Sequence, residues 1–189
     1  MNMRAMPGRV LGRIAIVAGL LLAGDIGAAL ARNISVPWIG QKTSSECGRA
    51  ALASLGARRG GNIEQLYARL PAPASAKGYS VADMRRLGPR VGVSLSVTAP
   101  AGIVIAGECS SRPAVTAHMK RLASLVSGGT PVVVPVSTWF GAGHYYVLVG
   151  ADASGFTVLD PGSAGLKTFS TAALTKSMCD FGYVALVAH

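Results

Sequence analysis

The stretch ECGRAALASLGA, Glu46–Ala57, opens with a cysteine and continues in small and apolar residues. Ser44 or Ser45 can cap a helix here, and residues 58–61, Arg-Arg-Gly-Gly, end it. Because this helix is apolar nearly all round, we expect it to be central and buried. Cys47 lies in its first turn, where free backbone N–H groups and the helix dipole favour a thiolate. A buried structural cysteine is the alternative.

The flanking segments predict helices first and a sheet afterwards. Asn62 can cap a second helix that Pro71 stops, and Ser80 with Asp83 resembles a capping box for a third. A strand over 91–97 and an amphipathic helix over 114–126 follow, and further strands are predicted over 131–137, 144–150, 156–160 and 183–187. This order predicts an α+β fold, with N-terminal helices packed on an antiparallel sheet.

Two residues on neighbouring strands could serve a cysteine nucleophile. His144 opens one strand of a predicted hairpin, and Asp160 ends the other. In an antiparallel pair, the numbers of two directly opposite residues always add to the same sum. If that sum is even, as the sum of 144 and 160 is, both side chains lie on one face of the sheet. The carboxylate can then hold one imidazole nitrogen and leave the other for a thiol. Taken singly, His144 could be an ordinary strand histidine, and Asp160 could belong to an Asp-Pro turn. With Cys47, the chain order supplies a nucleophile, a base and an orienting group, as in papain-like enzymes.

Gln41 precedes Cys47 by six residues. Its amide can return beside the nucleophile and donate to a developing oxyanion, together with the Cys47 N–H. The alternative is a plain polar loop residue. His118 lies mid-helix beside Lys120 and Arg121, and we expect it at the surface.

Five segments together resemble the bacteriocin-processing (double-glycine leader) cysteine peptidases, which include the leader-cleaving domains fused to export ABC transporters. These segments are Val36 to Gln41, Cys47-Gly48, Gly78 to Met84, Gly143 to Leu148 and Val158 to Pro161. The resemblance covers most of residues 36–169.

The resemblance implies a papain-like fold and a role for each site residue. Cys47 would be the nucleophile, His144 the general base, Asp160 the orienting carboxylate and Gln41 the oxyanion donor. Two departures stand out: Glu46 occupies the place where the family more commonly has Asp, and no transporter spans follow. A stand-alone exported relative is therefore expected to have another substrate than the transporters.

Residues 1–31 are predicted to be a signal peptide. Three arginines precede an apolar run, Ile14–Leu22, and Ala29-Leu30-Ala31 is a small-x-small cleavage site. Residues 32–189 would then form one exported domain, periplasmic or secreted. The alternative is that residues 1–31 stay as a membrane anchor, which Asp25 disfavours.

Loss of that segment, with three arginines and one aspartate, changes the formal net charge from +10 to +8. The basic pairs are scattered without interleaved aromatic residues, so no nucleic-acid partner is predicted. No CxxC, HExxH or nucleotide-binding motif occurs, so neither a metal nor a cofactor is expected. With Cys47 set aside, Cys109 and Cys179 remain and could form a disulfide in an oxidising compartment.

The sequence therefore predicts an exported cysteine endopeptidase that hydrolyses a peptide or protein substrate through a thiol acyl-enzyme, with cleavage after small residues such as Gly-Gly as one option. One alternative is a transglutaminase-like acyl transferase or amidase, because the same Cys, His and Asp order serves both. Another is a non-catalytic exported adaptor with the same fold. A Cys-His-His cell-wall hydrolase is disfavoured, since it expects a closer Cys-to-His spacing.

Overall fold

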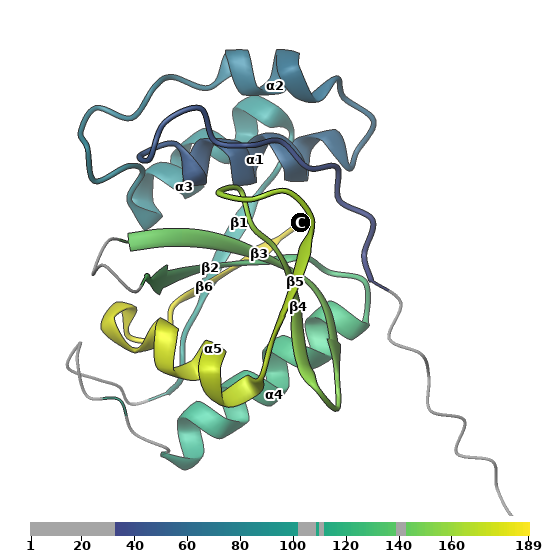
Figure 1. Ribbon diagram of the computed structural model, residues 1–189, viewed down its shortest axis with the longest axis vertical. Helices are drawn as coiled ribbons and strands as arrows, with labels where there is room; N and C mark the ends of the chain where they lie inside the picture. Colours follow the sequence, from purple (N-terminus) through teal and green to yellow (C-terminus); the bar gives the residue numbers. More distant parts are fainter. Residues whose placement is uncertain (1–32, 102–108, 110–111, 139–142) are drawn as a thin grey trace, which may run out of the picture.

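The computed structural model describes residues 33–101, 109, 112–138 and 143–189. Within these residues six strands form one antiparallel sheet in the order β1-β6-β2-β3-β4-β5 (Figure 1). The strands are β1 (Leu95–Thr98), β2 (Val132–Ser137), β3 (Gly143–Asp152), β4 (Gly155–Leu159), β5 (Leu166–Phe169) and β6 (Ala185–Ala188). The predicted signal segment, residues 1–31, lies outside the described residues.

Helices cover both faces of the sheet. In Figure 1, α1 (Cys47–Ala57), α2 (Ile63–Arg69) and α3 (Val81–Leu87) lie above it, and α4 (Pro113–Ser127) and α5 (Thr171–Met178) lie below it. Two short 3₁₀ turns, η1 (Gly88–Val91) and η2 (Cys179–Phe181), follow α3 and α5. The predicted α+β fold, with N-terminal helices packed on an antiparallel sheet, is confirmed.

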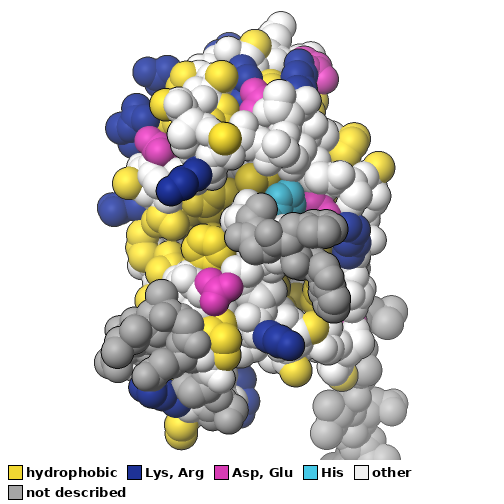
Figure 2. All heavy atoms as spheres, turned by 60° about the vertical axis from the view of Figure 1, so that its left-hand side comes forward, with side chains coloured by type: hydrophobic (Ala, Val, Ile, Leu, Met, Phe, Trp, Pro, Cys, Tyr) yellow, Lys and Arg dark blue, Asp and Glu magenta, His cyan; other side chains and the backbone are white. Residues whose placement is uncertain are grey.

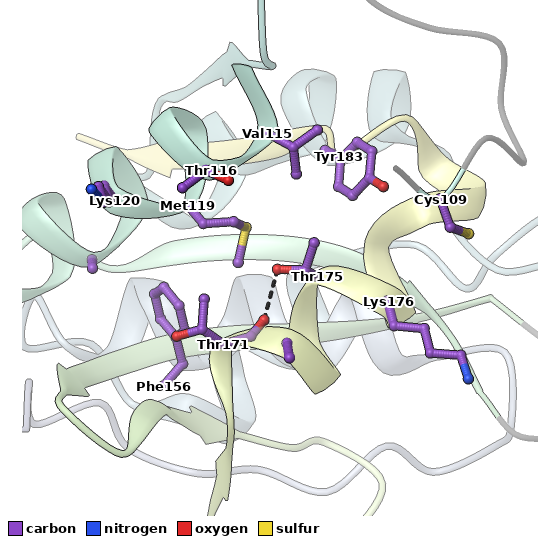
Figure 3. Close-up of a pocket in the computed structure, with 12 residues that line it drawn as sticks. Cys109, Val115, Thr116, Met119, Lys120, Phe156, Thr171, Thr175, Lys176 and Tyr183 are labelled. Carbon is purple, nitrogen blue, oxygen red and sulfur yellow. Dashed lines mark hydrogen bonds between the residues drawn. The ribbon is translucent and has the colours of Figure 1, made fainter. Parts of the chain in front are cut away.

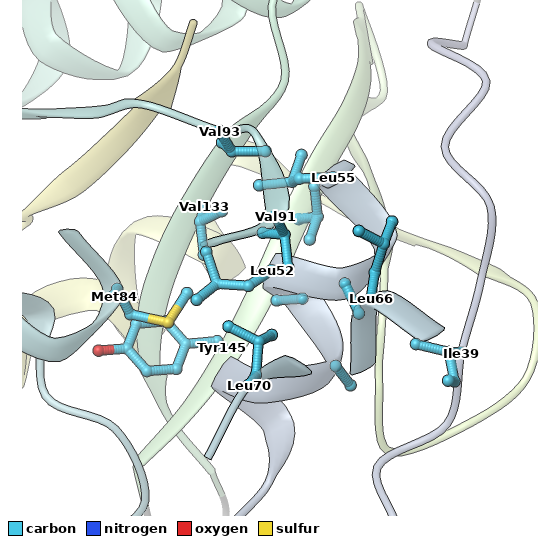
Figure 4. Packing of buried hydrophobic residues seen from close by; sticks show 14 of the residues in the cluster. Ile39, Leu52, Leu55, Leu66, Leu70, Met84, Val91, Val93, Val133 and Tyr145 are labelled. Atoms are coloured by element: carbon cyan, nitrogen blue, oxygen red, sulfur yellow. The ribbon is translucent and has the colours of Figure 1, made fainter. Parts of the chain in front are cut away.

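The two-residue period of the strands divides the core between the two helical layers. Val133 of β2 joins the cluster around α1, α2 and α3, whereas its neighbours Val132 and Val134 join the cluster around α4 and α5. Figure 4 shows Val133 and Tyr145 among the leucines of the first cluster. In α1 every residue except Arg49 is buried, so this helix is central, as its composition predicts.

Two of the three predicted helix starts are confirmed. The Asn62 side chain accepts a hydrogen bond from the backbone N–H of Gln65, and Ser80 and Asp83 form a complete capping box. The prediction of a serine cap on α1 is wrong, because Glu46 holds the N-cap position and gives no side-chain cap. Its carboxylate is instead paired with Arg49, with 2.5 Å between Oε1 and Nη1.

The sheet also differs from expectation at its edges. The strand predicted over 91–97 is shorter, because Val91 belongs to η1 and Gly92 turns the chain with φ 75°. β5 and α5 were not predicted. β5 has four mostly exposed residues and no apolar alternation, and α5 is an eight-residue helix rich in Thr and Ser, so neither carries a strong periodic signal.

The predicted disulfide joins Cys109 and Cys179, with 5.2 Å between their Cα atoms. It ties the chain before α4 to η2, and Cys47 is the free cysteine. In the described part of the chain, no helix has the length and hydrophobicity needed to cross a membrane.

Candidate active site

Cys47 is the first residue of α1 and is buried, with 4 % of its surface exposed. The start of α1 lies tightly against its neighbours, and Gly48 permits this approach. A Cβ at Gly48 would stand 2.9 Å from Met84 Sδ and 3.2 Å from Tyr145 Cδ2. Because Tyr145 is the neighbour of His144 on β3, this contact holds the helix N-terminus against the strand that carries the predicted base.

His144 and Asp160 are joined as the sequence predicts. His144 Nε2 lies 2.8 Å from Asp160 Oδ1. Val147 pairs with Leu159 across β3 and β4, an even register sum, so His144 and Asp160 share a face. A register shift occurs only farther along, between Leu148 and Gly150. Since Nε2 contacts the carboxylate, the other ring nitrogen is left for the thiol.

The Cys47 thiol and the His144 ring interact. Burial by itself would lower the pKa of His144, but hydrogen bonds with Asp160 and with the Cys47 thiol outweigh it and raise the pKa to about 9. A charged imidazolium is therefore favoured at neutral pH, which is the partner that a thiolate needs. The Tyr146 and His144 rings pack in a T-shaped arrangement, with 5.1 Å between ring centroids.

Asp160 is held by four donors. Oδ1 accepts from His144 and from the Gly162 backbone N–H at 2.7 Å, and Oδ2 accepts from Ser163 Oγ at 3.0 Å and Lys167 Nζ at 2.6 Å. Burial opposes ionisation, but hydrogen bonds from His144, Lys167 and the others hold the pKa of Asp160 well below its usual value. The carboxylate is therefore ionised and fixed in orientation.

Gln41 lies beside these groups. Its backbone N–H donates to the Pro161 carbonyl at 2.9 Å, which ties the loop before α1 to the turn after β4. A Cβ placed on Gly162 would stand 3.5 Å from His144 Cε1 and 3.6 Å from Gln41 Oε1, so these side chains converge there. Gln41 Nε2 donates one N–H to the Thr43 carbonyl at 3.0 Å, which leaves its second N–H for another acceptor.

Glu46, the departure from the family pattern, belongs to a buried network behind the nucleophile. Arg49 pairs with Glu46, donates from Nε to the Tyr67 carbonyl at 3.1 Å and lies over the Tyr67 ring at 4.3 Å. Burial would raise the pKa of Glu46, but hydrogen bonds from Arg49 and Tyr67 outweigh it and lower the pKa. The network supports the segment that leads into Cys47.

A cleft of about 480 Å³ adjoins Cys47 and His144. Cys47, His144, Tyr79 and Phe181 are among its lining residues, and Phe181 would contact a Cβ at Gly143. Figure 2 shows this face, with a hollow lined by hydrophobic side chains next to a histidine. The space beside the thiol is therefore suited to a mostly apolar or small-residue chain segment.

A larger cavity of about 810 Å³ lies between α4 and α5, and neither Cys47 nor His144 lines it. Figure 3 shows Met119 and Phe156 pointing into it. Its lining is apolar apart from threonine hydroxyls, the Tyr183 hydroxyl and lysines, and its cysteine is in the disulfide. We therefore place the chemistry at the smaller cleft.

His118 was predicted at the surface, and this is wrong: it is 4 % exposed. It follows Val115 by three residues and precedes Leu122 by four, so it lies on the buried stripe of α4. Burial lowers the pKa of His118. Among the residues that the structure describes, no three His, Cys, Asp or Glu side chains are grouped to hold a metal ion.

The structure brings Cys47, His144 and Asp160 together, with Gln41 beside them, and it adds Lys167, which the sequence did not indicate. The Gly162 contact could have been inferred, since an aspartate commonly accepts from the backbone N–H two residues on. Lys167 could not, because its approach depends on β5.

A scan against protein-family models finds no match, and a search of curated proteins finds none either. Solved structures are similar. The double glycine motif protease of an AMS/PCAT transporter, in complex with the leader peptide, has a TM-score of 0.57 and 18% identity and covers 82% of this chain and 92% of its own. The peptidase domain of Streptococcus ComA, a bifunctional ABC transporter involved in quorum sensing, has a TM-score of 0.59 and 17% sequence identity. The match covers 82% of this chain and 98% of that domain.

A C39-like peptidase from Bacillus anthracis has a TM-score of 0.56 and 14% identity, and it covers 84% of this chain and 97% of its own. In all three the match extends over nearly the whole of the known domain. The chain therefore has the α+β, papain-like fold of the C39-like double-glycine cysteine peptidase domains.

Proposed function

We propose that this protein is an exported cysteine endopeptidase. The observation that carries the proposal is a set of three neighbouring side chains. Cys47 at a helix N-terminus lines the same cleft as His144, whose Nε2 lies 2.8 Å from the buried Asp160. These are the nucleophile, base and orienting group of thiol acyl transfer.

In the proposed acylation step, the Cys47 thiolate attacks the carbonyl carbon of the scissile peptide bond and forms a C–S bond. The oxyanion accepts hydrogen bonds from the Cys47 backbone N–H and from the second N–H of Gln41 Nε2. As the C–N bond breaks, the His144 imidazolium gives its proton to the leaving amine, and a thioester remains.

In the deacylation step, neutral His144 takes a proton from water as the water oxygen attacks the thioester carbonyl. The C–S bond breaks and a carboxylic acid is released, which loses its proton to solvent. The thiolate and the imidazolium are restored. Asp160 keeps its proton-free state throughout and orients the ring.

The proposed substrate is a peptide or protein cleaved after small residues such as Gly-Gly. Two facts support this: one structural neighbour is a double glycine motif protease in complex with a leader peptide, and the cleft beside Cys47 is lined by the aromatic rings of Tyr79 and Phe181. The basic charge of the domain would favour acidic flanking residues.

The wild-type protein should cleave members of a mixed peptide library, with small residues enriched immediately before the cut. The measurement is mass spectrometry of the products, with Cys47→Ala as the control, because removal of the sulfur removes the acyl-enzyme. Added primary amine separates the alternatives: amide products in preference to acids would indicate a transglutaminase-like transferase. No turnover by a folded wild type would indicate an adaptor.

Export rests on the predicted signal peptide and is supported by the Cys109–Cys179 disulfide, since such bonds persist in oxidising compartments. In a secreting host, the processed chain should begin at Arg32, as read by N-terminal sequencing. Ala31→Arg should block this processing, because the cleavage site needs a small residue. An intact Met1 terminus found in the membrane fraction of the wild type would favour the anchor instead.

A further inference from the structure

Asp160 lies between two cationic partners. His144 Nε2 approaches Oδ1 at 2.8 Å, and Lys167 Nζ approaches Oδ2 at 2.6 Å. Gly162 and Ser163 supply the remaining donors, one to each oxygen. Both carboxylate oxygens are thus committed, and Asp160 cannot rotate away from His144 without breaking its contact with Lys167.

Strand pairing brings Lys167 to this position. Lys167 lies opposite Val158 in the β4–β5 ladder, and Asp160 follows Val158 by two residues, so Lys167 and Asp160 share a face. The two side chains differ in exposure, at 43% for Lys167 and 7% for Asp160. The lysine therefore brings a hydrated positive charge to a buried carboxylate.

The charges of the site alternate along a chain of contacts. In the resting site they are the His144 imidazolium, the Asp160 carboxylate and the Lys167 ammonium. When His144 gives its proton to the leaving amine, the ring becomes neutral and can no longer balance Asp160. A buried carboxylate without a cation is costly, but Lys167 remains beside it.

We propose that Lys167 is a positioning residue of this site: it fixes the Asp160 carboxylate for His144 and supplies the charge that lets His144 release its proton. The role rests on the proposed function. The charged or titratable groups that face His144 are Cys47 from α1, Asp160 after β4 and Tyr146 on β3, and those that face Lys167 are Asp160 and Tyr146. When the lysine is removed, Gly162 and Ser163 still hold Asp160, so the main effect is the loss of a competing positive charge. The carboxylate should then stabilise the His144 imidazolium more strongly.

The direct test is an NMR titration of the His144 ring in the purified protein. Lys167→Met should raise the titration midpoint of His144 by about 0.5 pH unit, a modest shift because Lys167 is partly solvated. Lys167→Arg should leave the midpoint where it is. The matched control is Lys176→Met, which removes an exposed lysine of α5 that lines the separate cavity. If Lys167→Met does not fold, Lys167→Gln serves the same purpose.

The pH dependence of kcat/KM should shift in the same direction as the His144 titration midpoint. In Lys167→Met the alkaline limb of kcat/KM should move up by the same amount, because the imidazolium persists to higher pH. Deacylation needs neutral His144, so it should slow about threefold near neutral pH. An unchanged His144 midpoint in Lys167→Met would overturn the proposal. A raised midpoint in a protein without peptidase activity would support the role of Lys167 and contradict the proposed function instead.

Discussion

Replacement of His144 by alanine should lower kcat/KM for peptide cleavage by about 10⁴-fold. In the proposed mechanism the ring both activates the Cys47 thiol and moves the proton to the leaving amine, so its loss removes two functions at once. The wild type should lose kcat/KM as the pH rises through about 9, because His144 then loses the proton that makes it an imidazolium. Initial rates from pH 5 to 10 measure both effects.

The matched control is His189→Ala, which removes an exposed histidine at the C-terminus that contacts Ser96. It should retain wild-type rates. Asp160→Asn should cost less than His144→Ala, since an amide oxygen can still accept from Nε2, and its alkaline limb should move to lower pH because the imidazolium has lost its counter-charge. A His144→Ala variant with near-normal rates would remove the proposed catalytic site.

Truncation of Gln41 to alanine should lower kcat by about 10²–10³-fold with little change in KM. The amide would meet the substrate oxygen only when that oxygen becomes an oxyanion, so its loss affects the transition state more than the bound substrate. The fold should tolerate the change, because the side chain makes a single hydrogen bond, to the Thr43 carbonyl, among the described contacts.

Gln65→Ala provides the control, as it removes an exposed glutamine of α2. Steady-state kinetics should show wild-type values for it, and thermal unfolding should give similar midpoints for both variants. A Gln41→Ala enzyme with unchanged kcat would show that the oxyanion is held by backbone groups alone. A higher KM together with a lower unfolding midpoint in Gln41→Ala would assign Gln41 a structural role.

Much of the fold could be predicted because each strong element carries its own periodic signal. α1 is apolar all round and is buried. α4 has buried residues every three to four positions, and this stripe packs on the sheet. The caps at Asn62 and Ser80 are local hydrogen bonds between residues three apart. Such features need no knowledge of distant parts of the chain.

β5 and α5 escaped prediction because their stability comes from contacts rather than from composition. β5 is held as an edge strand by its ladder with β4, and α5 by the burial of Leu174 and Met178. The surface assignment of His118 failed for a related reason. Its charged neighbours in sequence point elsewhere, while its own position on the helix faces the core.

The sequence by itself determined the order of Cys47, His144 and Asp160, the parity that puts the last two on one face, and the pair of cysteines left to bond. Those properties follow from residue types and from the two-residue period of a strand. Only the tertiary structure decided that α1 brings its N-terminus to the sheet at Gly48 and that Lys167 reaches Asp160. These contacts join segments far apart in the chain, and side-chain packing and strand pairing set them, neither of which any single segment encodes.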